Sequence, residues 1–371
     1  MILTLNAGSS SLKYALYAVD EAGQLTAAGE GLRERIAPGA HEAAFAEVVA
    51  ELEARGALAG VRAVAHRVVH GGQRFRAPTR IDAAVEEAIE ALAPLAPLHN
   101  PANLLGIRLA RTALPGVPHV AVFDTAFHAT LPEVAYRYPV PAAWFRDLGV
   151  RKYGFHGTSH AYVSGAARRV LAEAGRAHRR LVTLHLGNGC SAAAVLDGAC
   201  VDTTMGLTPL AGLMMGTRPG DLDPGLAPYL AARGVPLAEQ DRQLNRESGL
   251  LAVAGANDMR ELLRRRADGD EAARLAVEMF VYRLRKTVGA YAAVLGGLDA
   301  LAFTAGIGEN SDVIRAEVCA GLASFGVDLD PALNRRRGDG ARVVSTGRVA
   351  VLVVPTDEER AMATAAAEFV R

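Results

Sequence analysis

Three turns built from small residues each follow a short run of β-forming residues, and turns of this kind can bind phosphate. They span residues 6–11, 187–192 and 306–311, and Lys13 lies just beyond the first. Backbone N–H groups and hydroxyls in such a turn can surround phosphate oxygens, and a lysine can neutralise them. The three turns therefore favour phosphate chemistry, although any one of them alone has the composition of an ordinary hairpin turn.

Two well-known nucleotide-binding motifs do not fit this chain. Residues 187–192 superficially match G-x-G-x-x-A, but that fingerprint requires a helix to follow. The residues that do follow predict a hairpin around Asp197 and Gly198, a favoured two-residue turn. A P-loop is excluded as well, because no lysine follows a glycine at the G-x-x-x-x-G-K-[ST] spacing.

Histidines at a spacing of four raise the question of a metal site. His66 and His70 form one such pair, and His156 and His160 form the other. Neither pair carries the glutamate of the H-E-x-x-H motif, and the first falls on an expected strand. We favour structural or substrate-contact roles for both pairs over metal binding.

Two arginines lie in segments bounded by glycines. Arg67 precedes the sequence Val-Val-His-Gly-Gly, and Arg218 lies between Gly216 and Gly220. A lone arginine is usually a solvated surface charge, but a guanidinium confined in an apolar, glycine-bounded segment favours an anion clamp. We expect both arginines to hold anionic oxygens.

The elements that must position these residues alternate between strands and helices. Strands are expected at residues 2–5, 12–19, 61–69, 119–123, 181–186, 192–196, 199–202, 300–304 and 349–354. Helices are expected at residues 41–55, 82–92, 102–113, 224–233, 271–295 and 311–324, and from Asp357 onward. No short-period repeat is visible, but the order of strand, small-residue turn, strand and alternating helices and strands occurs twice. We therefore expect two related α/β halves facing a cleft, with a boundary near the proline-rich residues 131–141.

Composition narrows the class of protein. The 371 residues carry 40 basic and 40 acidic side chains, and this balance argues against a nucleic-acid-binding surface. Three cysteines are too few and too far apart for a disulfide framework or a zinc ligand set. The chain begins without a basic signal-peptide region and has no uninterrupted apolar run of about 18 residues. We expect a cytoplasmic globular protein with no nucleic-acid or membrane partner. Because only three of its 40 basic residues are lysines, Lys13 stands out as chemically required.

Nine segments, in order along the whole chain, closely resemble the acetate kinase family. They are residues 6–13, 66–72, 97–101, 123–128, 153–160, 185–189, 202–224, 303–311 and 355–359. The resemblance implies an α/β fold with two related β-β-β-α-β-α-β-α domains of the actin-like ATPase (ribonuclease H-like) superfamily around a nucleotide cleft. It implies a first domain of residues 1–125 plus 358–371, because the family's C-terminal helix packs back on that domain. The second domain, residues 126–357, would carry the surface of a homodimer.

The resemblance also implies site residues, matched motif by motif. The catalytic group would be Asp124, Arg67, Arg218 and His156. Arg67 would also bind the substrate, with an apolar pocket for the acyl methyl formed by Val69, Leu98, Phe155 and Pro209. The ATP site would comprise Lys13, His185, Leu186, Gly187, Asn188, Gly189, Asp258, Met259, Arg260, Gly306, Ile307, Gly308, Glu309 and Asn310. Asn6 and Glu358 would hold Mg²⁺, with Mn²⁺ able to substitute.

The implied reaction is ATP + acetate ⇌ ADP + acetyl phosphate. The acceptor needs no general base, because carboxylic acids with pKa values of about 4 to 5 are ionised near pH 7. Arg67 and Arg218 would hold the carboxylate and the phosphoryl oxygens, and His156 would donate a hydrogen bond to the same oxygens. Asp124 would position a magnesium-bound water or a cation, with a role in proton or phosphoryl handling left open. Two other readings stay open: a kinase for propionate or another short carboxylate, and an ATP-driven binding module of the actin or chaperone kind.

Three positions depart from the family pattern. Gln73 stands where glutamate is common, Met259 replaces a phenylalanine in the adenosine-contacting segment, and Asp357 replaces an asparagine. None belongs to the implied catalytic group. We expect them to alter nucleotide packing rather than the type of reaction.

Overall fold

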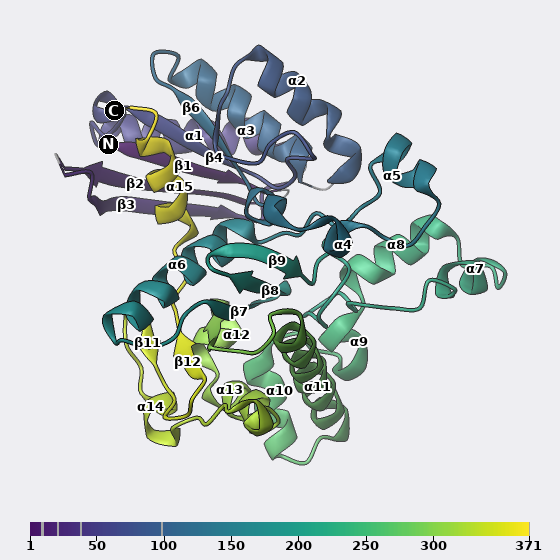
Figure 1. The fold of residues 1–371 in the computed structure, drawn as a ribbon. Helices are drawn as coiled ribbons and strands as arrows, with labels where there is room; N and C mark the ends of the chain where they lie inside the picture. Colours follow the sequence, from purple (N-terminus) through teal and green to yellow (C-terminus); the bar gives the residue numbers. More distant parts are fainter. Residues whose placement is uncertain (9–10, 21, 38, 98, 371) are drawn as a thin grey trace. The chain divides into compact units, whose positions relative to one another are not determined.

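The computed structural model describes residues 1–8, 11–20, 22–37, 39–97 and 99–370, which form two compact units. Unit 1 comprises residues 1–129, 157–159 and 357–371, and unit 2 comprises residues 130–156 and 160–356. The chain therefore leaves the first unit and returns to it at the C-terminus. Each unit is built around its own six-stranded sheet (Figure 1).

The sheet of unit 1 has the strand order β3-β2-β1-β4-β6-β5. Its strands are β1 (Ile2–Ala7), β2 (Ser11–Val19), β3 (Leu25–Glu34), β4 (Ala63–Val68), β5 (Thr79–Arg80) and β6 (His119–Phe123). The first three strands form an antiparallel meander, whereas β1, β4 and β6 run parallel to one another. The carboxyl ends of β1, β4 and β6 therefore lie along one edge of the sheet.

Helices cover both faces of this sheet. They are α1 (His41–Ala54), α2 (Ala83–Ala91), α3 (Asn100–Ala113) and α15 (Glu358–Ala367), with short 3₁₀ turns η1 (Leu58–Gly60), η2 (Ala93–Leu95) and η3 (Ala126–Thr130). Because successive strand residues point to opposite faces, Leu3 and Leu5 pack against α1, whereas Ile2 packs against Met362 of α15. Figure 1 shows the C-terminal helix α15, in yellow, beside the purple N-terminal strands. The last helix thus completes the core of the first unit.

The sheet of unit 2 repeats the topology of unit 1. Its order is β11-β12-β10-β7-β8-β9, formed by β7 (Arg180–Leu186), β8 (Cys190–Leu196), β9 (Ala199–Thr203), β10 (Ala300–Thr304), β11 (Arg342–Val343) and β12 (Ala350–Val353). Strands β7, β8 and β9 form an antiparallel meander, and β10 pairs in parallel with β7 and with β12. The two-residue strand β11 pairs antiparallel with β12 at one edge of the sheet. The duplicated α/β architecture expected from the sequence is confirmed.

Helices of unit 2 surround this second sheet and extend from it. They are α4 (Glu133–Tyr136), α5 (Ala142–Leu148), α6 (Gly157–Glu173), α7 (Leu226–Ala231), α8 (Leu237–Arg246), α9 (Gly249–Ala254), α10 (Met259–Ala267), α11 (Glu271–Val294), α12 (Ala305–Asn310), α13 (Asp312–Ala320) and α14 (Pro331–Arg335), with the 3₁₀ turn η4 (Ala323–Phe325). The first three residues of α6 cluster with unit 1. Within the described part of the chain, no helix combines the length and apolar character needed to span a membrane.

Several elements differ from those expected. Strand β3 was not expected, because its glycines argue against a strand, yet a β-carbon at Gly31 would collide with the ring of Tyr14 on β2. Glycine is therefore what allows these strands to approach. Helices α6, α8, α9 and α10 were also not expected. The turn expected at residues 306–310 is wrong: these residues form helix α12, which starts directly after β10 with Ala305 in the left-handed region (φ 64°).

Candidate active site

Arg67 and Asp124 form an ion pair at the carboxyl ends of two neighbouring strands of unit 1. Arg67 lies on β4 and Asp124 directly follows β6, which pairs with β4 in parallel register. Arg67 Nη2 lies 2.7 Å from Asp124 Oδ2, and Arg67 Nε lies 3.0 Å from Oδ1. The aspartate side chain is 2% exposed and the arginine side chain 23% exposed. Both carboxylate oxygens are thus used by the guanidinium, and its Nη1 donates to no residue that the structure describes.

Burial and neighbouring charges oppose each other at this pair. Burial lowers the pKa of Arg67, but the carboxylates of Asp124 and Glu358 outweigh it, and the pKa is raised overall. Arg67 is therefore a permanent cation. Burial raises the pKa of Glu358; Arg67 lowers it, and Asp124 and Glu359 raise it again. The Glu358 carboxylate is consequently disfavoured in its charged form.

Glu358, at the first position of α15, and Asn6, at the end of β1, suit a hard cation such as Mg²⁺. Among the described residues, none donates a hydrogen bond to the Glu358 carboxylate or pairs with it. A partly buried carboxylate beside two others leaves negative charge that a divalent cation would offset, and the asparagine amide adds an oxygen ligand. No group of three or more His, Cys, Asp or Glu side chains suited to a metal occurs in the described ranges. Mg²⁺ does not require one, since it usually keeps several waters and binds through one or two carboxylates plus substrate phosphates.

Lys13 lies across the hairpin from Asn6. The two residues are paired in the antiparallel register of β1 and β2. Lys13 Nζ lies 2.7 Å from Glu359 Oε1, so its charge is partly used within unit 1. The lysine is exposed enough to reach a ligand as well.

The segment after β4 carries Val69 and is fixed by side chains of other elements. The backbone N–H groups of residues 69–71 donate in turn to Asn103 (3.1 Å), Asn100 (3.0 Å) and Thr125 (3.0 Å). Val69 is buried, whereas Leu98, also expected in the acyl pocket, lies outside the described residues. Nothing in the sequence marks Asn100 and Asn103 as partners of this loop, because each is 30 or more residues away from the residue whose N–H it accepts.

Arg218 occupies a closed loop in unit 2. Gly212 N donates to Asp221 Oδ1 (2.7 Å) and Asp221 N donates to Gly212 O (2.9 Å), which ties the two ends of the loop together. Arg218 Nη1 donates to the carbonyl of Pro209 at 2.8 Å. Burial lowers the pKa of Arg218, and no carboxylate of the described residues pairs with it. It is a largely buried cation that lacks a counter-ion within its unit.

His156 and Arg218 both lie close to Gly189. A β-carbon at Gly189 would lie 2.6 Å from Arg218 Nη2 and 3.4 Å from His156 Nε2, so the glycine makes room for both. The His156 ring stacks on His185, with ring centroids 4.2 Å apart. His156 itself adopts a left-handed backbone conformation (φ 56°), which is uncommon for a residue with a side chain. Within unit 2 the structure thus brings together His156, His185, Gly189 and Arg218.

The rest of the expected acyl pocket also lies in unit 2. Phe155 is buried and Pro209 half-buried. Their segments are joined because the backbone N–H groups of Tyr153 and Gly154 both donate to the carbonyl of Gly206.

The turn between β7 and β8 is linked to two other loops. Gly187 N donates to Gly189 O, and the Asn188 carbonyl accepts from Gly216 N, next to the Arg218 loop. Asn257 Nδ2 donates to Asn188 Oδ1 at 3.1 Å, which connects the turn to the segment before α10. Leu186 is fully buried, so only its backbone can face a ligand.

Residues 258–260 form the start of α10 and have distinct surroundings. Asp258 caps the helix through Arg260 N, and the Arg260 side chain, which hydrogen-bonds to it, holds the pKa of Asp258 down to about 2. Arg260 is highly exposed and available to a ligand, whereas Met259 is buried in the core.

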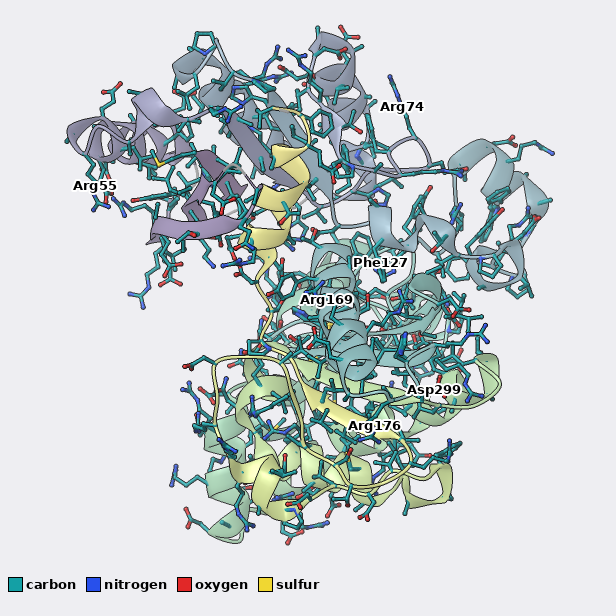
Figure 2. The ribbon with its side chains drawn as sticks, turned by 60° about the vertical axis from the view of Figure 1, so that its left-hand side comes forward. Arg55, Arg74, Phe127, Arg169, Arg176 and Asp299 are labelled. Atoms are coloured by element: carbon teal, nitrogen blue, oxygen red, sulfur yellow. The ribbon has the colours of Figure 1, made fainter. Side chains whose placement is uncertain are left out.

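Helix α12, residues 305–310, is fixed by two charged side chains. Glu309 Oε1 accepts from Ala305 N (2.8 Å) and Thr356 N (3.0 Å), which links the end of β10 to the segment after β12. The buried Arg315 donates from Nη1 to the carbonyls of Gly308 and Glu309, both at 2.9 Å. Burial, with a smaller contribution from Arg342, lowers the pKa of Arg315 to about 10. Nothing in the sequence singles out Arg315, because a lone arginine on an amphipathic helix is usually exposed, as Arg74 is on its loop (Figure 2).

The duplicated topology and the residues at its strand ends define an α/β phosphotransferase of the actin-like ATPase type. The Acetokinase family model matches residues 1–364, and the chain belongs to this family.

Relatives match over nearly the whole chain. The chain is 49% identical to acetate kinase of Deinococcus radiodurans, covering 99% of this chain and 98% of that protein. It is 50% identical to acetate kinase of Streptomyces coelicolor, covering 98% and 95%. Among solved structures, Porphyromonas gingivalis acetate kinase matches with a TM-score of 0.91 at 39% identity, covering 100% of this chain and 99% of that one. A propionate kinase from Francisella tularensis matches with a TM-score of 0.90, also at 39% identity, covering 98% of each.

Glu358→Gln should raise the thermal stability of the metal-free protein while lowering its activity. The raised pKa means that the charged carboxylate destabilises the fold above its folded-state pKa, and Gln removes that charge. The stability gain should be present near pH 7 and should vanish as the pH falls below the ordinary value of 4.5, where both folded and unfolded glutamate are protonated. Turnover should fall by about 10²-fold or more through loss of the cation ligand.

The measurement is the melting temperature of both proteins in EDTA from pH 4 to 8, with Glu368→Gln, an exposed glutamate at the end of α15, as the control. An unchanged or lower melting temperature at pH 7 for Glu358→Gln would contradict the electrostatic account.

Proposed function

We propose that this protein transfers the γ-phosphoryl group of ATP reversibly to acetate, giving acetyl phosphate and ADP. The family membership and the full-length relatives named acetate kinase support this activity. The structural observation that carries it is Arg218: a largely buried guanidinium, in a closed loop, with no carboxylate of the described residues paired to it. Such a cation requires an anionic ligand, and both a carboxylate and a transferring phosphoryl group supply one.

Unit 1 would contribute Arg67, Asp124, Lys13 and the cation site. Because both oxygens of Asp124 accept from Arg67, the aspartate is better suited to hold the arginine in place than to act as a base. Acetate needs no base, since it is already ionised near pH 7. Arg67 Nη1 is then directed to substrate oxygens, and Lys13 to nucleotide phosphate.

Asn6 and Glu358 would hold Mg²⁺, for which Mn²⁺ would substitute. When bound, the cation neutralises charge on the β- and γ-phosphates. Unit 2 would contribute Arg218 and His156 toward the transferring oxygens, and the segments at residues 185–189, 258–260 and 306–310 toward the nucleotide. Phosphoryl transfer depends on such positioning and charge stabilisation rather than on a protein nucleophile.

The test is a hydroxamate assay with ATP, Mg²⁺ and a series of carboxylates, which traps any acyl phosphate formed. Acetyl hydroxamate formed faster than the propionyl or butyryl product supports acetate as the substrate. Faster formation with propionate would favour the alternative raised by the Francisella tularensis neighbour. ATP hydrolysis without any hydroxamate would favour the ATP-driven binding module and contradict the kinase.

We also propose a homodimer formed through unit 2. Helix α11 leaves Leu275 (47% exposed) and Tyr282 (66% exposed) on the surface, seven residues apart and therefore on one face. Sedimentation of the purified protein tests this, because a monomer at micromolar concentration would contradict it.

Arg218→Gln should lower kcat by about 10²–10³-fold, the cost of losing one charged donor to the transferring group. Its melting temperature should stay unchanged or rise, because the substitution removes a desolvated charge that has no ion-pair partner among the described residues. Arg233→Gln, an exposed arginine after α7, is the matched control and should keep full activity. Wild-type turnover in Arg218→Gln would remove this residue from the catalytic group.

Val69→Ala should shift acyl preference toward propionate. If Val69 lines the pocket for the acyl methyl, trimming two methyl groups makes room for one methylene, and the propionate-to-acetate ratio of kcat/KM should rise about 10-fold. If Val69 is only a core residue, stability should fall by about 1–3 kcal/mol and all carboxylates should be affected alike. Measuring kcat/KM for acetate, propionate and butyrate beside the melting temperatures separates the two outcomes, and an unchanged ratio would refute the pocket assignment.

A further inference from the structure

Four side chains of unit 2 form a continuous hydrogen-bonded chain that ends at His156. His156 Nδ1 lies 2.8 Å from Ser191 Oγ, which lies 2.8 Å from His160 Nε2. His160 Nδ1 in turn lies 2.7 Å from Thr183 Oγ1. Thr183, His160 and Ser191 are completely buried. The side chains therefore hold one another without water.

The fold explains why these four residues meet. Ser191 on β8 pairs with His185 on β7, and Thr183 lies two residues before His185, so all three point to the same face of the sheet. His156 and His160 are four residues apart at the start of α6, hence on one side of that helix. The hydrogen-bonded side chains thus lie between one face of the sheet and the N-terminus of helix α6.

The donors and acceptors available in these four side chains determine which atom donates in each hydrogen bond. The hydroxyl of Thr183 has no other hydrogen bond to a described residue, so its hydrogen is satisfied only if it donates to His160 Nδ1. His160 then carries its proton on Nε2 and donates to Ser191, and Ser191 donates to His156 Nδ1. In the reverse direction Thr183 would be an acceptor, and its own hydrogen would be buried without a partner, which is costly.

We infer that Thr183, His160 and Ser191 are positioning residues that hold His156 as the Nε2–H tautomer. A ring whose Nδ1 accepts a hydrogen bond must carry its proton on Nε2 in the neutral state. His156 Nε2 and Arg218 Nη2 both lie next to the position that a β-carbon of Gly189 would occupy. Stacking on His185 at 4.2 Å fixes the plane of the ring, and the chain through Ser191 fixes its proton.

The consequence is a neutral hydrogen-bond donor beside a guanidinium. This inference rests on the proposed function, because such a donor matters for catalysis only if His156 faces the transferring phosphoryl group. There, a donor set in advance stabilises charge without reorganisation at the moment of transfer. A ring in the other tautomer would present a lone pair to anionic oxygens and repel them.

The tautomer is tested by ¹H–¹⁵N correlation spectra of the full-length protein labelled with ¹⁵N-histidine, recorded without substrate. Ring resonances are assigned with His156→Gln and His160→Gln. Both rings should be Nε2–H tautomers in the parent protein, and Ser191→Ala should give a mixture at His156. A proton on Nδ1 of His156 in the parent protein would overturn the inference.

Kinetics test the positioning role. Ser191→Ala should lower kcat roughly 10- to 100-fold with little change in KM for ATP or acetate, by analogy with the loss of a partner that orients a metal-ligating histidine. Thr183→Val should lower kcat by roughly 3- to 10-fold, and Thr183→Ser should restore it because it keeps the hydroxyl donor. An unchanged kcat in Ser191→Ala, or a change confined to KM, would overturn the role.

The matched control is Thr203→Val. Thr203 is a fully buried threonine of the same sheet whose hydroxyl donates to the carbonyl of Ala192 rather than to a histidine. It should lose stability without losing kcat; a loss of kcat equal to that of Thr183→Val would overturn the inference. The spectra need no substrate, so the two failures can be told apart. A parent protein that makes no acyl phosphate contradicts the proposed function, and a proton on Nδ1 of His156 contradicts this inference.

Discussion

The carboxyl-end edge of the first sheet contains three carboxylates and only two cations, and this imbalance determines what the site can bind. Asp124, Glu358 and Glu359 face Arg67 and Lys13 closely enough to influence the pKa of Glu358. Arg67 is paired with Asp124 and Lys13 with Glu359, so Glu358 is left as the excess negative charge. Burial makes that charge costly, because a desolvated carboxylate without a partner favours its neutral form. A hard cation bound beside Glu358 would offset this charge and reduce its cost.

Unit 2 has the opposite imbalance. Arg218 is a desolvated cation with no carboxylate partner within the described part of its unit, and its loop is closed by Asp221 rather than by contacts to the guanidinium. The groups shown beside it carry no negative charge: the carbonyl of Pro209 accepts from Nη1, and the ring of His156 lies near Nη2 at Gly189. An anion is the group that such surroundings stabilise. Unit 1 therefore carries an uncompensated negative charge and unit 2 an uncompensated positive charge. The proposed ligands would offset both, a divalent cation the first and phosphate groups the second.

Strand-end residues could be predicted from the sequence, whereas the residues that hold them could not. Arg67 is marked by its glycine-bounded segment and Asp124 by the resemblance to a family motif, and the structure places them at the ends of the neighbouring strands β4 and β6. Their supports come from distant positions without a local pattern: Asn103 binds the loop 34 residues before it, and Ser191 binds His156 35 residues before it. The missed elements have a similar cause. Strand β3 contains Gly31, which close approach to β2 requires. Helix α6 begins with Gly-Thr-Ser, and tertiary packing overrides the poor helix propensity of these residues.

The duplicated topology also explains how one fold supports two kinds of chemistry. In both units residues of the proposed site occupy the first hairpin and the end of the fourth strand, and unit 1 also uses the end of its last parallel strand. Unit 1 has Asn6, Arg67 and Asp124 at these places, which are side chains that carry charge or ligate a cation. Unit 2 has the Gly187–Gly189 turn and helix α12, where backbone N–H groups and small residues dominate and Glu309 serves to fix the backbone. Because sheet geometry alone determines where strand ends lie, the same places carry ionic side chains in unit 1 and mainly backbone N–H groups and small residues in unit 2.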